Sequence, residues 1–169
     1  DGDAVPGYLN QLEDGTKSLN PAGDAYWEGK NLHPLGMGVL MADQIGATDL
    51  RDTFLKRMKK ILVNWFTYDG KDDISYFIYN QNWGTLYYEQ SEFGANASIC
   101  DHHFTYGYFM FAATVLATYD QEFYNDYKGM IEMMIRDYAN PSDNDSDYCK
   151  FRAYDVYEGH SWAGGYADN

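Results

Sequence analysis

Apolar residues recur at helical spacing in residues 48–66, TDLRDTFLKRMKKILVNWF. Every third or fourth position of one face is apolar: Leu50, Phe54, Met58, Ile61 and Trp65. The other face is basic: Arg51, Lys56, Arg57, Lys59 and Lys60. This period predicts an amphipathic helix with Asp49 as its N-cap. Because only one side is apolar, we expect an outer-layer helix with Trp65 in the core and the basic run in solvent.

Another helix is predicted over residues 31–46, NLHPLGMGVLMADQIG. Pro34 suits a first helical turn, and Gly46 suits a C-terminal stop. Gly36 and Gly38 weaken the helix but allow another backbone to pack closely against it.

The N-terminal segment lacks so clear a pattern. Residues 1–28 are rich in Gly, Asp and Asn and contain Pro6 and Pro21. Such clusters mark turns and loops, so this segment is predicted to be mostly loop.

The remaining segments predict one hairpin and two more helices. Two β-prone runs flank NQNWG in residues 74–90, the pattern of a β-hairpin. Ser98 and Asp101 fit the S-x-x-D start of a helix that runs to about Thr118. That helix is nearly uncharged after His103, so we expect it to be buried on all sides. Residues 120–138 form an amphipathic pattern that begins at a capping aspartate.

Half-exposed and buried helices therefore alternate along the chain. This alternation favours two concentric layers of helices, as in an α/α barrel or toroid, over a simple bundle. The predicted fold class is all-α with a small β-hairpin insertion. No repeat of fixed period is visible in the sequence.

Composition narrows the possible partners. The 169 residues include 12 Lys and Arg against 26 Asp and Glu, giving a net charge of −14. Nucleic acids and anionic membranes require basic patches, so neither is an expected partner. Aromatic residues make up 18% of the chain, which favours a carbohydrate ligand through stacking of rings on sugar faces, although helical cores also use tyrosine. No apolar stretch reaches the length of a membrane span.

The cysteines and the chain ends leave alternatives open. Cys100 and Cys149 form no metal motif, and a disulfide and two free thiols are both compatible with their spacing. The start, DGDAVPGYLN, lacks the features of a signal peptide, so any export signal is expected upstream. The end, SWAGGYADN, stops in a Gly-rich loop, and we expect the chain to be a fragment.

The densest polar cluster is ICDHHFTYGYFMF, residues 99–111, and three interpretations compete for it. A metal site is disfavoured, because Asp101, His102 and His103 are adjacent whereas helical ligands prefer i, i+3 or i, i+4 spacing. His33 and His160 add no second ligand pair. The plainest interpretation is a helix cap with hydrogen-bonded histidines near a surface.

The third interpretation is acid catalysis on a glycoside. Hydrolysis requires a protonated carboxylic acid near the leaving oxygen and a second carboxylate. Asp101 could be the acid, although a helix N-terminus favours a charged carboxylate, so burial or a nearby negative charge would be needed. YDVYEGHSW could add Asp155 or Glu158 as carboxylates, His160 as a hydroxyl partner and Trp162 as a stacking platform.

DHHFTYGYFMFAATVLA, followed some fifty residues later by FRAYDVYEGHSWAGG, resembles glycoside hydrolase family 81, the endo-β-1,3-glucanases. The similarity extends from about Lys30 to Asn169. It implies that residues 1–169 are a fragment of one catalytic domain, a partial (α/α)6 barrel. It further implies a secreted enzyme that hydrolyses internal bonds of β-1,3-glucans such as laminarin, curdlan or cell-wall glucan with inversion, without metal or organic cofactor.

The resemblance also assigns residues. It implies that Asp101 is the general acid and that the base is a glutamate beyond Asn169, so the isolated chain is expected to be inactive. Thr105 stands where many members have a substrate-contacting histidine. Glu158 is the weaker local carboxylate candidate and could orient His160. The candidates for substrate binding are His103, Tyr106, Asp155, His160 and Trp162.

A non-catalytic β-1,3-glucan-binding fragment is the alternative function. A half-cleft without its base could still hold a glucan chain through Trp and Tyr faces. As a piece of a barrel, the chain would expose apolar surface, so we expect it to contact the remainder of a parent chain or to self-associate.

Overall fold

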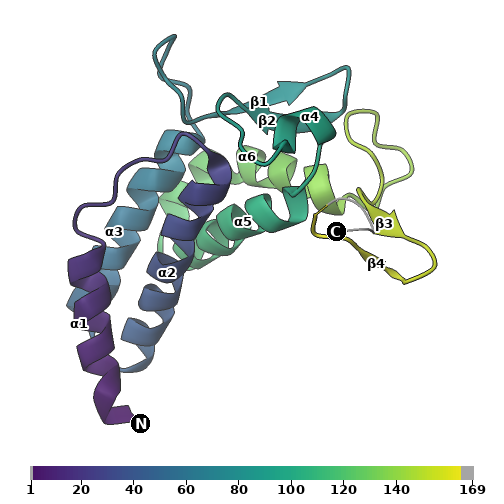
Figure 1. Ribbon diagram of the computed structural model, residues 1–169. Coiled ribbons are helices and arrows are strands. Elements are labelled where there is room, and N and C mark those ends of the chain that lie inside the picture. The colour runs from purple at the N-terminus through teal and green to yellow at the C-terminus, as the bar shows by residue number, and fades with distance from the viewer. Residues whose placement is uncertain (1, 165–169) are drawn as a thin grey trace.

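The computed structural model describes residues 2–164, and this part of the chain is mostly helical (Figure 1). Its four long helices are α2 (Ala25–Gln44), α3 (Thr48–Trp65), α5 (His102–Tyr119) and α6 (Gln121–Ala139). Its shorter helices are the 3-10 turn η1 (Gly2–Ala4), α1 (Val5–Gly15) and α4 (Ala95–Ser98). The Gly-rich end of the chain after Gly164 lies outside the described residues.

Two small antiparallel hairpins accompany the helices. Strands β1 (Phe77–Asn80) and β2 (Thr85–Tyr88) pair with Phe77 opposite Tyr88. Strands β3 (Tyr154–Asp155) and β4 (His160–Ser161) pair with Asp155 opposite His160. The predicted all-α class and the hairpin near residues 74–90 are confirmed; the second hairpin was not expected from the sequence.

The long helices alternate between two kinds of environment. Helix α2 packs against both α3 and α5, and α5 packs against α6 (Figure 1). Helices α2 and α5 are apolar around most of their circumference, whereas α3 and α6 each bury a single stripe. Largely apolar and amphipathic helices therefore alternate along the chain, as expected.

Residues 1–28 are not mostly loop, so this prediction is wrong. Helix α1 covers Val5–Gly15, because Val5, Leu9 and Leu12 lie at helical spacing and Leu9 is buried in the core. Pro6 falls in the first turn, where its missing N–H removes no helix hydrogen bond. Arg57 of α3 donates to the carbonyl oxygen of Glu13 at 2.6 Å and thereby ties the end of α1 to the helix layer.

Helix α2 begins earlier than predicted. It starts at Ala25 rather than near Asn31, because the Asp24 carboxylate caps it by accepting from the Trp27 amide at 3.1 Å. Pro34 therefore lies inside the helix and not in its first turn. The predicted stop is confirmed, since Gly46 follows the helix with a φ of +73°.

The start of α3 differs in one detail from the prediction. Its N-cap is Ala47, and Asp49 lies in the first turn without capping the helix. The aspartate charge still complements the positive end of the helix dipole. The buried stripe is confirmed, and the Trp65 indole N–H donates to the buried carboxylate of Glu28 at 3.0 Å.

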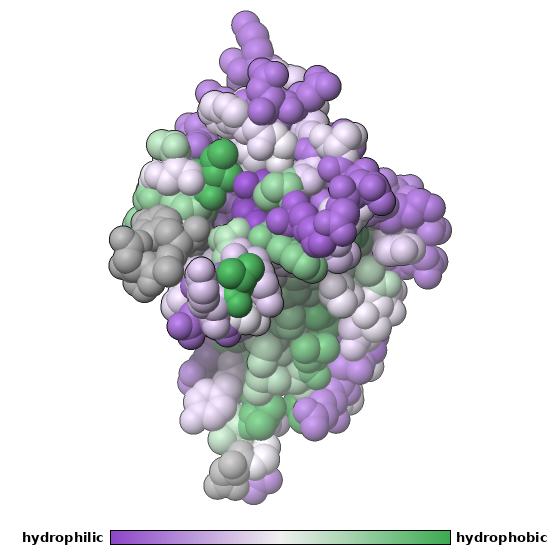
Figure 2. Space-filling view, turned by 90° about the vertical axis from the view of Figure 1, so that its right-hand side faces the viewer, coloured by the Kyte–Doolittle hydropathy of each residue, from purple (hydrophilic) through white to green (hydrophobic). Residues whose placement is uncertain are grey.

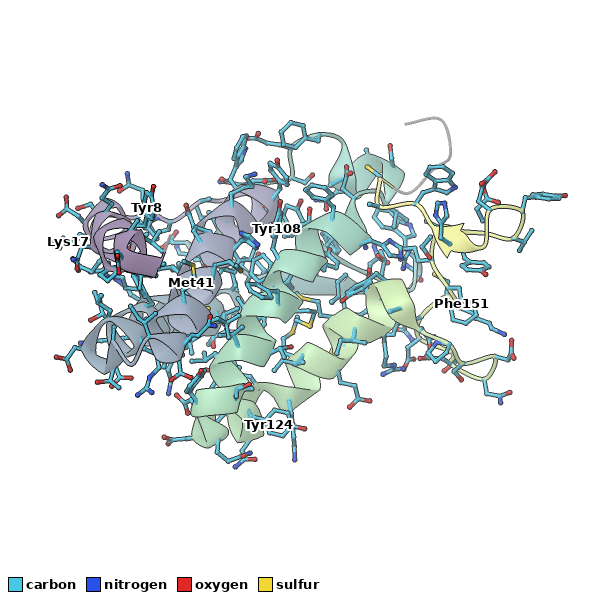
Figure 3. The ribbon with its side chains drawn as sticks, turned by 90° about the horizontal axis from the view of Figure 1, so that it is seen from below. Tyr8, Lys17, Met41, Tyr108, Tyr124 and Phe151 are labelled. Carbon is cyan, nitrogen blue, oxygen red and sulfur yellow. The ribbon has the colours of Figure 1, made fainter. Side chains whose placement is uncertain are left out.

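Three glycines on α2 determine how closely neighbouring side chains approach this helix. A Cβ placed on Gly36 would lie 2.7 Å from the Phe111 ring, and one on Gly38 would lie 2.9 Å from Phe54. A Cβ on Gly29 would lie 2.6 Å from the ring of Tyr108, which is labelled between α2 and α5 in Figure 3. Gly36 and Gly38 therefore do permit close packing, but against side chains rather than, as expected from the sequence, against the backbone of another segment.

One side of α2 and α5 stays open within the described residues. Met37 and Leu40 of α2 are 40% and 42% exposed, and Phe104 of α5 is 45% exposed. Figure 2 shows that apolar residues gather on the lower part of the side where the β3–β4 hairpin lies. Helix α5 is therefore not buried on all sides in this chain, contrary to the expectation for a helix of its composition.

Replacing Gly29 with alanine is expected to lower the free energy of unfolding by about 1 kcal/mol, because overpacking costs about 1–3 kcal/mol and exceeds the gain of about 1 kcal/mol from helix propensity. Gly129 in exposed α6 is the matched control, since a Cβ there meets no atom within 4 Å. Gly129→Ala should stabilise the protein. Urea denaturation of both variants checks this, and equal effects would contradict the close packing at Gly29.

Candidate active site around Asp101

The backbone is left-handed at two positions, Ile99 and Asp101, just before α5. Ile99 has a φ of +50° and Asp101 a φ of +60°, a region that costs non-glycine residues about 1–2 kcal/mol each. The predicted S-x-x-D helix start is wrong, because Ser98 ends α4 and the Asp101 side chain caps no amide of α5. The strained turn leaves the Asp101 carboxyl unused by the helix.

Asp101 lines a hollow of about 250 Å³. Helix α2, strand β2, the loop before α4 and the first turn of α5 all contribute to its walls. The lining residues are Tyr26, Tyr88, Glu92, Phe93, Ala95, Asp101, Phe104 and Thr105. A small hollow with one carboxyl and several rings suits a ligand with both apolar faces and hydroxyl groups.

The rings in this hollow form one cluster. The Tyr26 ring centroid lies 5.4 Å from that of Phe93 and 5.8 Å from that of Phe104. Phe93 is 65% exposed, and Phe104 is also largely exposed. Exposed ring faces beside a carboxyl provide flat apolar surfaces on which a sugar ring can stack.

A second carboxylate, that of Glu92, faces the same hollow. It also borders a neighbouring hollow of about 380 Å³ that Asp24 and Trp27 line. The Trp27 indole N–H donates to Glu92 at 2.9 Å, and the Glu92 amide donates to Asp24 at 2.9 Å. These bonds fix the loop that forms the wall opposite α5.

Cys100 contacts the candidate acid directly. Its thiol donates to Oδ2 of Asp101 at 3.3 Å. Burial, followed by the neighbouring Asp101, raises the pKa of the Cys100 thiol to about 11. Cys100 is buried and Cys149 is exposed. Both are free thiols, so of the two alternatives, a disulfide or two free thiols, the structure has the second.

The two adjacent histidines have different surroundings. His102 is buried, and its Nδ1 is hydrogen-bonded to the fully buried Asp137. His103 is half-buried with its ring 5.4 Å from that of Tyr138. Burial, and then the neighbouring His102, lowers the pKa of His103. Its role in substrate binding stays a prediction.

Tyr106 does not line the hollow, and its role in substrate binding stays a prediction. Its side chain is fully buried, and its hydroxyl donates to the carbonyl oxygen of Leu86 at 2.9 Å. The reason is helical spacing: Tyr106 lies one turn after His102 on the same face of α5, 4.5 Å between ring centroids, and points toward β2.

The other predicted residues lie together on the β3–β4 hairpin. The Trp162 indole N–H donates to Asp155 at 3.0 Å, and this bond, with backbone amides, holds the pKa of the Asp155 carboxyl below its usual range. The His160 ring centroid lies 4.7 Å from that of Trp162. Glu158 donates its amide to Asp155 at 3.2 Å, which makes it part of the turn.

The hairpin is joined to the strained turn by one backbone contact. The Asp101 amide donates to the carbonyl oxygen of Gly164 at 3.4 Å. In Figure 3 the hairpin lies near Phe151 at the end of the molecule opposite α1. The structure thus brings the two sequence motifs to the same end of α5, although Asp155, His160 and Trp162 do not line the Asp101 hollow.

Two kinds of feature are absent from residues 2–164. No group of three or more His, Cys, Asp or Glu is arranged to hold a metal ion in this part of the chain. Within the same residues, no helix combines the length and apolar character needed to cross a bilayer.

Sequence reasoning missed the aromatic part of the hollow. Tyr26 lies in a segment read as loop, and Phe93 lies in a stretch without period. Phe104 directly follows the histidines, but helical spacing alone does not show that it stays exposed. The one available signal was the high aromatic content around residues 26–27 and 93–108.

Comparison with known proteins gives consistent matches. Residues 9–169 match the family model described as the glycosyl hydrolase family 81 C-terminal domain. The chain is 38% identical over 170 residues to a glucan endo-1,3-beta-D-glucosidase of Acetivibrio thermocellus, covering 99% of this chain and 22% of that protein. It is also 38% identical over 148 residues to a glucan endo-1,3-beta-D-glucosidase of Thermobifida fusca, covering 86% of this chain and 20% of that protein.

A solved structure is also similar. A mutant of CtLam81A, a glycoside hydrolase family 81 protein from Clostridium thermocellum, superposes with a TM-score of 0.87 at 37% identity. The match covers 98% of this chain and 23% of that structure. The chain therefore spans about one fifth of the length of the relatives that it matches.

The two thiols should react at very different rates. At pH 8 a thiol with a pKa of about 11 is almost entirely protonated, and Cys100 is also shielded from reagents. We expect iodoacetamide to alkylate Cys149 in the native protein and Cys100 only after unfolding. Mass spectrometry of tryptic peptides measures this. Rapid native labelling of Cys100, with Cys149→Ser as background, would contradict its buried position.

Proposed function

The chain belongs to glycosyl hydrolase family 81, and from this membership we propose that it is part of the catalytic region of an endo-β-1,3-glucanase. The observation that carries the proposal is Asp101, whose carboxyl caps no helix amide and which lines a hollow with exposed rings. A carboxyl left free by its own helix is available to a ligand.

In this proposal Asp101 is the general acid of an inverting reaction. Its carboxyl protonates the glycosidic oxygen while a second carboxylate deprotonates a water on the opposite face of the sugar. The two carboxyls would be separated by roughly 6.5–9.5 Å, which leaves room for the water. We place the base on a glutamate beyond Asn169, outside the described residues.

The substrate is proposed to lie on the aromatic cluster. The ring faces of Tyr26, Phe93 and Phe104 would stack on glucose units beside Asp101, and Glu92 would accept hydrogen bonds from sugar hydroxyls. Laminarin, curdlan and cell-wall glucan offer such faces without charge, in keeping with a chain of net charge −14. Action on these polymers would take place outside the cell. The proposal assigns a metal ion to none of the described residues.

The helices are proposed to form part of an (α/α)6 barrel. Helices α2 and α5 would belong to its inner layer and α3 and α6 to its outer layer, in agreement with their apolar and amphipathic surfaces. Further helices of a longer protein would then cover the open side that carries Met37 and Leu40.

Glucan binding without hydrolysis is the second candidate function. The exposed cluster around Phe93 supports it, because stacking on sugar does not require Asp101. If the 169-residue chain binds laminarin in affinity electrophoresis but releases no reducing sugar, the chain by itself is a binding fragment. Hydrolysis by the 169-residue chain would contradict the placement of the base outside it.

Asp101→Asn should abolish hydrolysis in a protein that contains this chain and the rest of the catalytic region. Asparagine tolerates the left-handed backbone as well as aspartate does, so the variant loses only the proton donor. A loss of about 10²–10⁴-fold in reducing-sugar release from laminarin is expected.

Asp143→Asn is the matched control, because Asp143 is a solvent-exposed aspartate paired with Lys150 on a surface loop. It should leave activity unchanged. Wild-type turnover by Asp101→Asn would overturn the acid assignment. Loss of wild-type activity in EDTA would instead point to a metal-dependent reaction.

Phe104→Ala should weaken glucan binding more than it slows the reaction. Removing one stacking ring is expected to raise KM several-fold, since it removes binding that is equal in the ground and transition states. Tyr68→Ala is the control: Tyr68 is 59% exposed, its ring centroid lies 4.7 Å from that of Tyr76, and it borders neither hollow. Laminarin saturation kinetics measure both, and equal KM values would show that glucan does not stack on Phe104.

A further inference from the structure

The carboxylate of Asp137, in the last turn of α6, is completely buried and binds groups from three other segments. In β2 it accepts from the Thr85 hydroxyl at 3.0 Å and from the Leu86 amide at 2.7 Å. In α5 it accepts from Nδ1 of His102. From the segment before β3, the Arg152 guanidinium lies 3.5 Å from it.

Arg152 also donates two hydrogen bonds to backbone carbonyl groups. Its Nε donates to the backbone carbonyl of Asp137 at 2.8 Å, and its Nη2 donates to the carbonyl of Gly84 at 2.9 Å. A buried carboxylate is stable only when such partners satisfy it, and loss of one partner leaves a charge unpaired. The partners are therefore held in fixed positions relative to α6.

Two of these partners lie in the two sequence motifs, His102 beside Asp101 and Arg152 before the β3–β4 hairpin. His102 follows Asp101, whose left-handed backbone persists only if the surrounding structure holds it. Ala153 follows Arg152, and its carbonyl accepts the Trp162 amide at 3.1 Å. The same carboxylate thus anchors the turn that carries Asp101 and the base of the hairpin that carries Trp162.

We propose that Asp137 is a positioning residue that fixes Asp101 through His102 and fixes the β3–β4 hairpin through Arg152. It touches no substrate itself. The inference rests on the proposed role of Asp101 as the acid, and it explains why histidine and arginine stand in the two motifs that flank the site.

The test uses Asp137→Asn and Arg152→Met in a protein that contains the complete catalytic region. Misplacing the acid by about 1 Å costs up to about 100-fold in rate, so kcat should fall about 10- to 100-fold. KM should change little, because none of the hydrogen bonds or ion pairs of this network involves Tyr26, Phe93 or Phe104. Arg152→Lys keeps a donor and a charge and should recover part of the lost kcat.

Arg136→Met is the matched control. Arg136 precedes Asp137 in α6 and pairs with Asp145 at 2.7 Å in a surface loop, away from Asp101. It should lower the thermal midpoint without changing kcat. If the network only stabilises the fold, Arg152→Met and Arg136→Met will both keep wild-type kcat below their melting temperatures, and the positioning role is refuted.

Asp101→Asn separates this inference from the function on which it rests. If Asp101→Asn is active, the acid assignment fails first. If Asp101→Asn is inactive while folded Asp137→Asn and Arg152→Met keep wild-type kcat, only the positioning role fails. If Asp137→Asn does not fold, the two Arg152 variants decide. Loss of Arg152 leaves the bonds from β2 and α5 in place, so it displaces Asp101 only through the hairpin segment, whose Gly164 carbonyl accepts the Asp101 amide.

Discussion

The burial of one carboxylate, that of Asp137, is the constraint that organises this part of the molecule. Apolar helix surfaces can slide past one another at modest cost, but a buried charge must meet its donors at fixed distances and angles. Strand β2, the start of α5 and the segment before β3 therefore meet α6 in one arrangement. Helix packing brings these segments together, and the directional hydrogen bonds determine the position of each segment relative to α6.

A second buried carboxylate, that of Glu28, has the same effect on another part of the core. It accepts from the Ala22 amide at 3.0 Å and from the Trp65 indole N–H. Glu28 therefore joins the segment before α2 to α3. Helix α2 also approaches the rings of α5 closely because Gly29 and Gly36 have no side chain. The fold thus combines a few directional hydrogen bonds with close helix contacts that depend on glycine.

Sequence periodicity could predict the elements that bury one regular face, namely α3, α6 and the β1–β2 hairpin. It failed for α1, where Pro6 and the polar residues around it hide a short apolar stripe. For the site, the family resemblance grouped Asp101 with Trp162 as candidates for one cleft. It could not show the left-handed turn at Asp101 or the core position of Tyr106, because both depend on contacts with β2 and the hairpin that are remote in sequence.

The open side of α2 and α5 couples the behaviour of the chain to ionic strength. An apolar surface that carries Met37 and Leu40 favours contact between molecules, whereas a net charge of −14 keeps them apart. Charge repulsion reaches only about 10 Å at 0.1 M salt and about 3 Å at 1 M. Salt therefore shifts the balance from dispersed to associated chains, and a low-salt buffer is the condition in which this acidic chain stays monodisperse.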